Sequence, residues 1–311
     1  MKLKEYSLEK IKEIISFEKD FRDLNSWKFE HIPLGEMEHT YKLSKGNKKY
    51  FLKELKPHEA QMEYFLVKLR LRDLPFSLYP KLLKQKILIR RFIVGRMLRS
   101  KNIDLKLIKD FVNMRNKMND KKYFDKYNIL KLNNYSQKDN GFYEKDLEGS
   151  FSKAMSVLNK LNKYHLNEVE NFKRILNYLK GNKKSINKDF VNMPFAKQHQ
   201  DFREDNIIIE KGRHKLIDWG SAYGYNPFMY DVAPFLINNA QALKIYVKNS
   251  KNCKGVSKEQ ISRWLYVALA ARFLDIIMSR LHFSENRTNT KADCKKYLAY
   301  EYKTYKKLLD C

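Results

Sequence analysis

A short hairpin framed by polar residues, 196–218, constrains the fold of this chain more than any other segment. Its sequence, AKQHQDFREDNIIIEKGRHKLID, places two apolar runs on either side of a Lys-Gly-Arg turn, a pattern typical of two paired β-strands. Long stretches before and after it carry apolar residues at helical spacing instead. The chain must therefore accommodate a pair of strands among helices.

The remaining sequence divides into a strand-rich beginning and a helical continuation. The expected strands lie within 27–55, with a turn at SKGNKK, at 82–83 and over 87–94. The expected helices are 7–21, one opened by Pro57, 102–119, 148–180 and 257–310, with an irregular polar excursion at 120–147. The pattern predicts an α+β fold with two lobes, residues 1–93 and residues 94–311.

Four polar residues frame the hairpin: His199, Asp201, Asn206 and Asp218. A carboxylate on a loop, such as Asp201, can accept or orient the proton of a hydroxyl group. The oxygens of Asn206 and Asp218 can hold Mg²⁺, which prefers one or two carboxylates together with phosphates and water. This spacing suits phosphoryl transfer.

The same residues resemble the signature of the aminoglycoside phosphotransferase and choline kinase superfamily, which has a protein-kinase-like fold. That signature is H-x-D-x-x-x-x-N, an apolar strand, I-D-[FW] and a later D-x-A. This chain carries H-Q-D at 199–201, N-I-I-I at 206–209, I-D-W at 217–219 and D-V-A at 231–233. The segment HQDFREDN is most similar to the corresponding segment of the CotS-type spore-coat kinases. The resemblance implies a small antiparallel-sheet lobe with helices, which binds the nucleotide, and a larger, mostly helical lobe for catalysis and substrate.

In the small lobe the resemblance implies a set of nucleotide contacts. Gly35 would belong to the loop that covers the phosphates, and Lys53 would contact them. Lys53 would pair with Glu63, which we favour over Glu59 because Glu59 falls too near the start of its helix. The backbone of the hinge would meet the adenine; its residues are Arg91, Phe92 and Ile93.

In the large lobe the resemblance implies the catalytic residues. Asp201 would orient the acceptor hydroxyl, and Asn206 and Asp218 would hold Mg²⁺. Arg203 would either neutralise the transferred phosphoryl group or face solvent. Asp231 would cap a helix and brace the catalytic loop.

Composition narrows the class of protein. Lys and Arg number 63 against 36 Asp and Glu, a formal charge of +27, but 43% of the residues are hydrophobic, which excludes a disordered chain. The basic residues are spread along the chain as 48 Lys and 15 Arg, a bias typical of AT-rich coding, so nucleic acid is not the expected partner. The apolar run from Trp264 to Ala271 stops at Arg272, too short for a membrane span. A charged N-terminus without a signal-peptide pattern and three widely spaced cysteines favour the cytoplasm.

The expected activity is Mg²⁺-dependent transfer of the γ-phosphate of ATP or GTP to a hydroxyl of a small molecule. The excess of positive charge favours a neutral or anionic acceptor. Two alternatives remain open. One is a non-catalytic, kinase-like binding or spore-coat-associated protein, which the single glycine of the covering loop favours. The other is a kinase that acts on a macromolecular partner, which only the charge favours.

Overall fold

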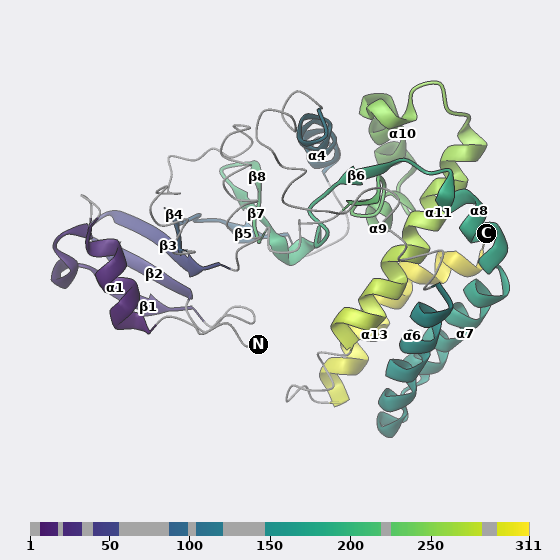
Figure 1. Cartoon of the computed structure of the whole chain (residues 1–311), viewed down its shortest axis with the longest axis horizontal. Helices are drawn as coiled ribbons and strands as arrows, with labels where there is room; N and C mark the ends of the chain where they lie inside the picture. The colour runs from purple at the N-terminus through teal and green to yellow at the C-terminus, as the bar shows by residue number, and fades with distance from the viewer. Residues whose placement is uncertain are drawn as a thin grey trace. The chain divides into compact units, whose positions relative to one another are not determined.

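The computed structural model of the chain (Figure 1) describes residues 7–17, 21–32, 40–55, 87–98, 104–120, 147–218, 225–281 and 291–310. The chain divides into two compact units, each made of segments that are distant in the sequence. Unit 1 comprises Met1–Arg99, Lys117–Asn133 and Arg203–Tyr223, and unit 2 comprises Ser100–Asn116, Asn134–Phe202 and Gly224–Cys311. The lobe boundary expected after residue 93 stays a prediction.

An antiparallel sheet of four strands forms the first part of unit 1. Strands β1 (Lys28–His31), β2 (Thr40–Lys45), β3 (Lys48–Glu54) and β4 (Ile87–Arg91) pair in chain order. The two-residue turn between β2 and β3 begins with Gly46, whose φ of +53° suits glycine. The strands and the turn expected within 27–55 are confirmed, and the strand expected over 87–94 is confirmed in a shorter form.

Helix α1 (Leu8–Ser16, purple in Figure 1) packs against this sheet. The hydroxyl of Ser7 caps the helix by accepting from the N–H of Lys10 at 3.2 Å. The isoleucines of α1 are buried with apolar side chains of the strands; this core contains Ile11, Ile14, Ile15, Trp27, Leu43, Leu52, Ile87 and Ile89. Because side chains alternate along a strand, Lys53 points to the face opposite Leu52, away from this core.

A three-stranded sheet completes the described part of unit 1 and contains the hairpin. Strands β5 (Arg96–Met97), β7 (Ile207–Glu210) and β8 (Arg213–Leu216) pair in the order β5-β7-β8. The turn residues Lys211 and Gly212 have φ of +49° and +69°, as a type I′ turn requires. The hairpin expected from the sequence is confirmed, and it clusters with the N-terminal strands.

The described residues of unit 2 are helical apart from two short paired strands, β6 (Phe195–Lys197) and β9 (Tyr225–Pro227). Its helices are α4 (Leu105–Met118, the last two residues of which belong to unit 1), α6 (Leu147–Leu161), α7 (Asn167–Gly181), α8 (Lys183–Val191), α9 (Ala233–Leu236), α10 (Ala240–Asn249), α11 (Lys258–Asp275) and α13 (Lys291–Tyr305). A π-helix, Ile276–Leu281, continues α11, and single 3₁₀ turns of unit 2 occur at Asn162–Tyr164, Lys251–Cys253 and Lys306–Leu309. Two further 3₁₀ turns, Leu24–Ser26 and Glu204–Asn206, belong to unit 1.

The core of unit 2 surrounds α11, in which every residue from Val267 to Leu274 is buried. The core role expected for its apolar residues is confirmed, and the α+β fold class is confirmed with it. No helix in the described ranges is long and apolar enough to cross a membrane. The helix expected from Pro57, the strand at 82–83 and most of 120–147 lie outside the described residues.

Candidate active site

The loop 198–202, which contains Asp201, follows β6 in unit 2. The pairing of β6 with β9 brings residues 195–197 beside residues 225–227. Gln198 extends this link through its side chain. Its amide nitrogen donates to the carbonyl of Pro227, and its oxygen accepts from the N–H of Asp231 at 3.2 Å. The start of the loop is therefore tied to the end of β9 and to the segment after it.

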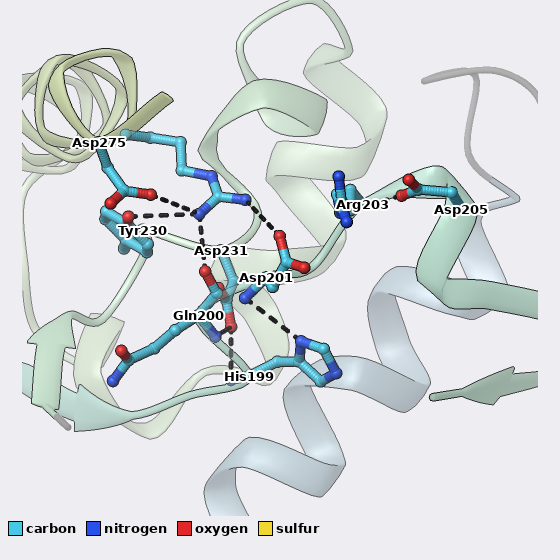
Figure 2. A network of polar contacts seen from close by, with 9 residues as sticks. His199, Gln200, Asp201, Arg203, Asp205, Tyr230, Asp231 and Asp275 are labelled. Atoms are coloured by element: carbon cyan, nitrogen blue, oxygen red, sulfur yellow. Dashed lines mark hydrogen bonds and ion pairs between the residues drawn. The ribbon is translucent and has the colours of Figure 1, made fainter. Parts of the chain in front are cut away.

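Asp231 is fully buried and holds two consecutive peptide groups of the loop (Figure 2). Its Oδ2 accepts from the N–H of His199 at 2.7 Å and from that of Gln200 at 3.2 Å. Burial raises the pKa of Asp231 to about 6, against the lowering effects of Arg272 and of these two N–H groups. The bracing role expected for Asp231 is confirmed. Its expected role as a helix cap is wrong: Val232 is the N-cap of α9 and no side chain caps that helix, because the carboxylate points to the loop.

Two loop residues that flank Asp201, His199 before Gln200 and Phe202 after it, are buried. His199 is buried, and its Nδ1 accepts from the N–H of Asp201 at 3.3 Å. Phe202 is buried against Phe111 and Phe235, with ring centroids 4.4 and 5.3 Å away. The side chain of Asp201 itself is 22% exposed, so this carboxylate reaches solvent while His199 and Phe202 are held in the core.

Arg272 of α11 also contacts the loop, although no motif assigns it a role. Its guanidinium donates to the carbonyl of Gln200 at 2.7 Å and lies 3.7 Å from Oδ1 of Asp201. The sequence contains one signal for it, because Arg272 interrupts an apolar run and a charge on a buried helix face must be paired. That signal indicates a partner but not which one.

Asn206 and Asp218 lie in unit 1, at the open end of the hairpin. Asn206 ends the 3₁₀ turn before β7, and its carbonyl accepts from the N–H of Ile217 at 2.9 Å. Asp218 comes next, with a left-handed φ of +57°, a conformation that Asp tolerates better than most residues. Strand pairing therefore brings the two predicted metal ligands to one end of the hairpin.

Lys53 of β3 pairs with Asp218. In the sheet it lies opposite Thr40 on one side and Leu88 on the other. Its Nζ lies 3.1 Å from Oδ1 of Asp218, and the two side chains are 18% and 46% exposed. The lysine predicted to contact phosphates and a residue predicted to hold metal are thus neighbours, although they are separated by 165 positions in the chain.

The other predicted site residues are Arg203, the hinge residues, Gly35 and Glu63, with Glu59 as the alternative to Glu63. The Nε of Arg203 pairs with Oδ1 of Asp205 at 3.1 Å, so its guanidinium is engaged within its own turn. At the hinge, Arg91 ends β4, the N–H of Phe92 donates to Lys49 at 3.0 Å, and Ile93 follows without regular structure. Gly35, Glu63 and Glu59 lie outside the described residues.

The candidate residues thus fall into two chemical groups. Unit 1 contains Lys53, Asn206 and Asp218, a cation and oxygen ligands suited to a nucleotide phosphate and its metal. Unit 2 contains Asp201, a carboxylate suited to a hydroxyl group. Within the described ranges, no group of three or more His, Cys, Asp or Glu side chains is placed to hold a metal ion.

Comparison with models of protein families and with curated proteins finds no match, whereas comparison with solved structures finds several. An ethanolamine kinase from Plasmodium vivax is similar over 95% of this chain and 87% of its own, with a TM-score of 0.56 and 13% identity. A choline kinase from Streptococcus pneumoniae is similar over 95% and 98%, with a TM-score of 0.52 and 14% identity. A spectinomycin phosphotransferase in complex with ADP and spectinomycin is similar over 99% and 96%, with a TM-score of 0.52 and 13% identity. The chain therefore has the fold of these kinases, as the resemblance implied.

Proposed function

We propose that this protein transfers the γ-phosphate of ATP or GTP to a hydroxyl group of a small molecule. The observation that carries the proposal is the ion pair between Lys53 and Asp218, at 3.1 Å. One residue was expected to contact phosphates and the other to hold metal, on motifs far apart in the chain. A nucleotide site needs these two residues close together, and their pairing across 165 positions of the chain supports the proposal. The shared fold with small-molecule kinases supports the same conclusion.

The residues of unit 1 fit a nucleotide with its magnesium ion. The amide oxygen of Asn206 and the carboxylate of Asp218 are ligands that Mg²⁺ accepts, with phosphates and water completing its shell. Magnesium would neutralise charge on the phosphates. Lys53 would exchange the carboxylate of Asp218 for phosphate oxygens, leaving Asp218 available to the metal.

Asp201 would orient the acceptor hydroxyl and accept its proton. Its carboxylate is accessible, while the backbone around it is held by Asp231 and by the ring of His199. Phosphoryl transfer depends on positioning and charge neutralisation more than on covalent chemistry by the protein. A braced loop with a partly exposed carboxylate supports this assignment.

The acceptor is expected to be a small alcohol. The similar structures are kinases of ethanolamine, choline and spectinomycin. The charge of +27 favours a neutral or anionic acceptor for this chain. A substrate panel should therefore contain amino alcohols, neutral sugars and polyols, and alcohols that carry a carboxylate or phosphate.

A thermal-shift screen with MgATP, MgGTP and this panel, followed by a phosphotransfer assay, tests the proposal. We expect nucleotide to raise the melting temperature, because a ligand that binds only the folded state stabilises it. Asp218→Ala should abolish turnover, and Asp201→Asn should lower kcat by about 10²–10⁴-fold, the usual contribution of a general base. Asp23→Asn is the matched control, because it removes another Lys–Asp pair of unit 1, to Lys45 at 3.5 Å, and should leave kcat unchanged.

Equal turnover in wild type and Asp218→Ala, or no response to either nucleotide, would refute the proposal. Nucleotide binding without transfer to any acceptor or to water would favour a non-catalytic, kinase-like protein instead.

A further inference from the structure

Arg272 carries a positive charge into the interior of unit 2. It lies near the end of α11, in the run where every residue is buried, and is only 3% exposed. A guanidinium is tolerated in such a place only when its donors are paired, because moving a charge out of water is costly. The partners of Arg272 therefore indicate what its charge does.

The guanidinium of Arg272 joins the loop to Tyr230 and to Asp275 of its own helix; Figure 2 labels these partners and draws Arg272 without a label. On the loop, Nη1 donates to the carbonyl of Gln200 at 2.7 Å, and Nη2 lies 3.7 Å from Oδ1 of Asp201. Nη1 also donates to the hydroxyl of Tyr230 and to Oδ2 of Asp275, each at 3.3 Å. The guanidinium stacks over the ring of Tyr230, 5.0 Å from its centroid. Tyr230 and Asp275 thus hold Arg272, and Arg272 holds the loop.

Arg272 and Asp231 both form hydrogen bonds with the backbone of Gln200. Asp231 accepts from its N–H at 3.2 Å, and Arg272 donates to its carbonyl at 2.7 Å. Between these bonds Gln200 has a φ of +66°, a left-handed conformation that residues other than glycine keep only where their surroundings impose it. This turn directs the side chain of the next residue, Asp201.

The helix changes geometry next to this contact. The α-helical part of α11 ends at Asp275, three residues after Arg272, and continues as a π-helix over Ile276–Leu281. Segments of π-helix are rare and occur frequently at functional sites. The pair of Arg272 and Asp275 therefore lies at a departure from regular helix, as well as at the loop.

We propose that Arg272 is a positioning residue for Asp201: it fixes the loop backbone and the carboxylate in the orientation that an acceptor hydroxyl requires. The role of Asp201 rests on the proposed function, but the fixing of the loop can be measured without turnover. A lysine at position 272 would supply the charge without the several directed donors of a guanidinium plane. Charge and geometry can therefore be separated by substitution.

The test compares Arg272→Lys, Arg272→Met and Asp275→Asn with wild type, and uses Arg115→Lys and Arg115→Met as matched controls. Arg115 is also a buried arginine of unit 2 that stacks on a tyrosine, Tyr246, 4.9 Å from the ring centroid. It donates to the carbonyl of Phe228 and, at 2.7 Å, to Ser250, both outside the loop 198–202. The readouts are kcat and KM for nucleotide and acceptor, and amide hydrogen exchange in the loop.

We expect Arg272→Met to lower kcat by roughly 100-fold, the scale of a misplaced catalytic group, without a comparable change in the KM for nucleotide. Arg272→Lys should recover part of kcat, and Asp275→Asn should lower it less than Arg272→Met. Loop exchange should be faster in all three than in the Arg115 variants. If Arg272→Met does not fold, the kcat and loop exchange of Arg272→Lys and Asp275→Asn decide whether the proposal holds.

If Arg272 only stabilises the fold, its variants should have the same kcat and the same loop exchange as Arg115 variants with an equal melting temperature. That result would overturn the proposal. If wild type transfers phosphate to no acceptor, the proposed function fails. The exchange comparison then decides alone whether Arg272 fixes the loop.

Discussion

Gln200 is strained by its place in the loop, and this strain can be measured. Its φ of +66° suits glycine, and its side-chain Nε2 is buried without a hydrogen-bond partner among the described residues. We predict that Gln200→Gly raises the free energy of unfolding by about 1 kcal/mol. Relief of left-handed strain contributes roughly 1–3 kcal/mol, and the greater freedom of glycine in the unfolded chain removes about 0.5–1 kcal/mol. Urea unfolding measures the difference.

Gln198→Gly is the matched control for this prediction. Gln198 has no left-handed backbone, and its side chain bonds Pro227 and Asp231, so its loss should destabilise the protein. A Gln200→Gly variant less stable than wild type would show that the conformation of this residue is not strained.

Asp231 should make the stability of the protein depend on pH. Burial raises its pKa from 3.8 to about 6. Below about pH 4 the carboxyl is protonated in both states, and above about pH 6 it is ionised in both, so the cost of burying the charge develops between these values. We predict that wild type loses up to about 3 kcal/mol relative to Asp231→Asn as pH rises through this window.

Asp23→Asn is the comparison for the pH series, because the pKa of Asp23 is shifted in the opposite direction from that of Asp231. The hydrogen bond from Ser26 and the charge of Lys45 lower the pKa of Asp23, so wild type should gain stability relative to this variant as pH rises from acid values. A flat difference between wild type and Asp231→Asn from pH 4 to 6 would contradict the raised pKa.

For single residues, the sequence predicts Asp201, Asn206 and Asp218 as site residues but does not predict Arg272, and the difference has a physical reason. Phosphoryl transfer constrains the types and spacing of Asp201, Asn206 and Asp218, so a local pattern can identify them. Arg272 acts through a backbone carbonyl and a carboxylate some 70 positions away in the chain, contacts that no local spacing encodes. Only its place within an apolar run distinguishes it.

Among the elements, the short strand β5 depends on a glycine. A Cβ on Gly95 would lie 2.7 Å from Cγ2 of Ile208 and would collide with the backbone carbonyl of Ile209. The obstacle is the backbone of β7, the strand that begins after Asn206, so it cannot move without breaking the β5–β7 pairing. We predict that Gly95→Ala costs about 1–3 kcal/mol, the usual range for overpacking, measured by urea unfolding.

Gly181, at the end of α7, is the matched control for Gly95. A Cβ there meets nothing within 4 Å, and its φ is not left-handed, so Gly181→Ala should be neutral or stabilise by roughly 0.5–1 kcal/mol. Equal effects of the two substitutions would show that β5 and β7 can separate without cost.

Elements are predictable from the sequence where their signal is local. The isoleucines of α1, the turn at Gly46 and the Lys211-Gly212 turn each identify their element through spacing or residue type. The pairing of β5 with β7 joins Arg96 to Ile209, and such a distant partner leaves no periodic trace in either segment. For this reason the sequence predicts the hairpin but not the sheet it joins.

For the whole molecule, the division into units separates the two halves of the proposed reaction. The chain passes from unit 2 to unit 1 between Phe202 and Arg203, one residue after Asp201. The residues expected to hold nucleotide and metal thus share one unit, and the residue expected to orient the acceptor belongs to the other. The charge of +27 does not reveal this division, because net charge concerns solubility and partners rather than fold.

This division predicts where nucleotide will protect the chain. We expect MgADP to slow amide hydrogen exchange in 40–55, 87–98 and 203–218 of unit 1, which contain Lys53, the hinge, Asn206 and Asp218. Helices α6 and α7 of unit 2 should change little, because none of the proposed nucleotide ligands lies on them. Lys53→Met should abolish this protection when it is measured at an MgADP concentration that saturates the wild-type protein. Lys45→Met, which removes the surface pair with Asp23, should retain the protection. Protection confined to unit 2 would place the nucleotide elsewhere and contradict the assignment of Lys53.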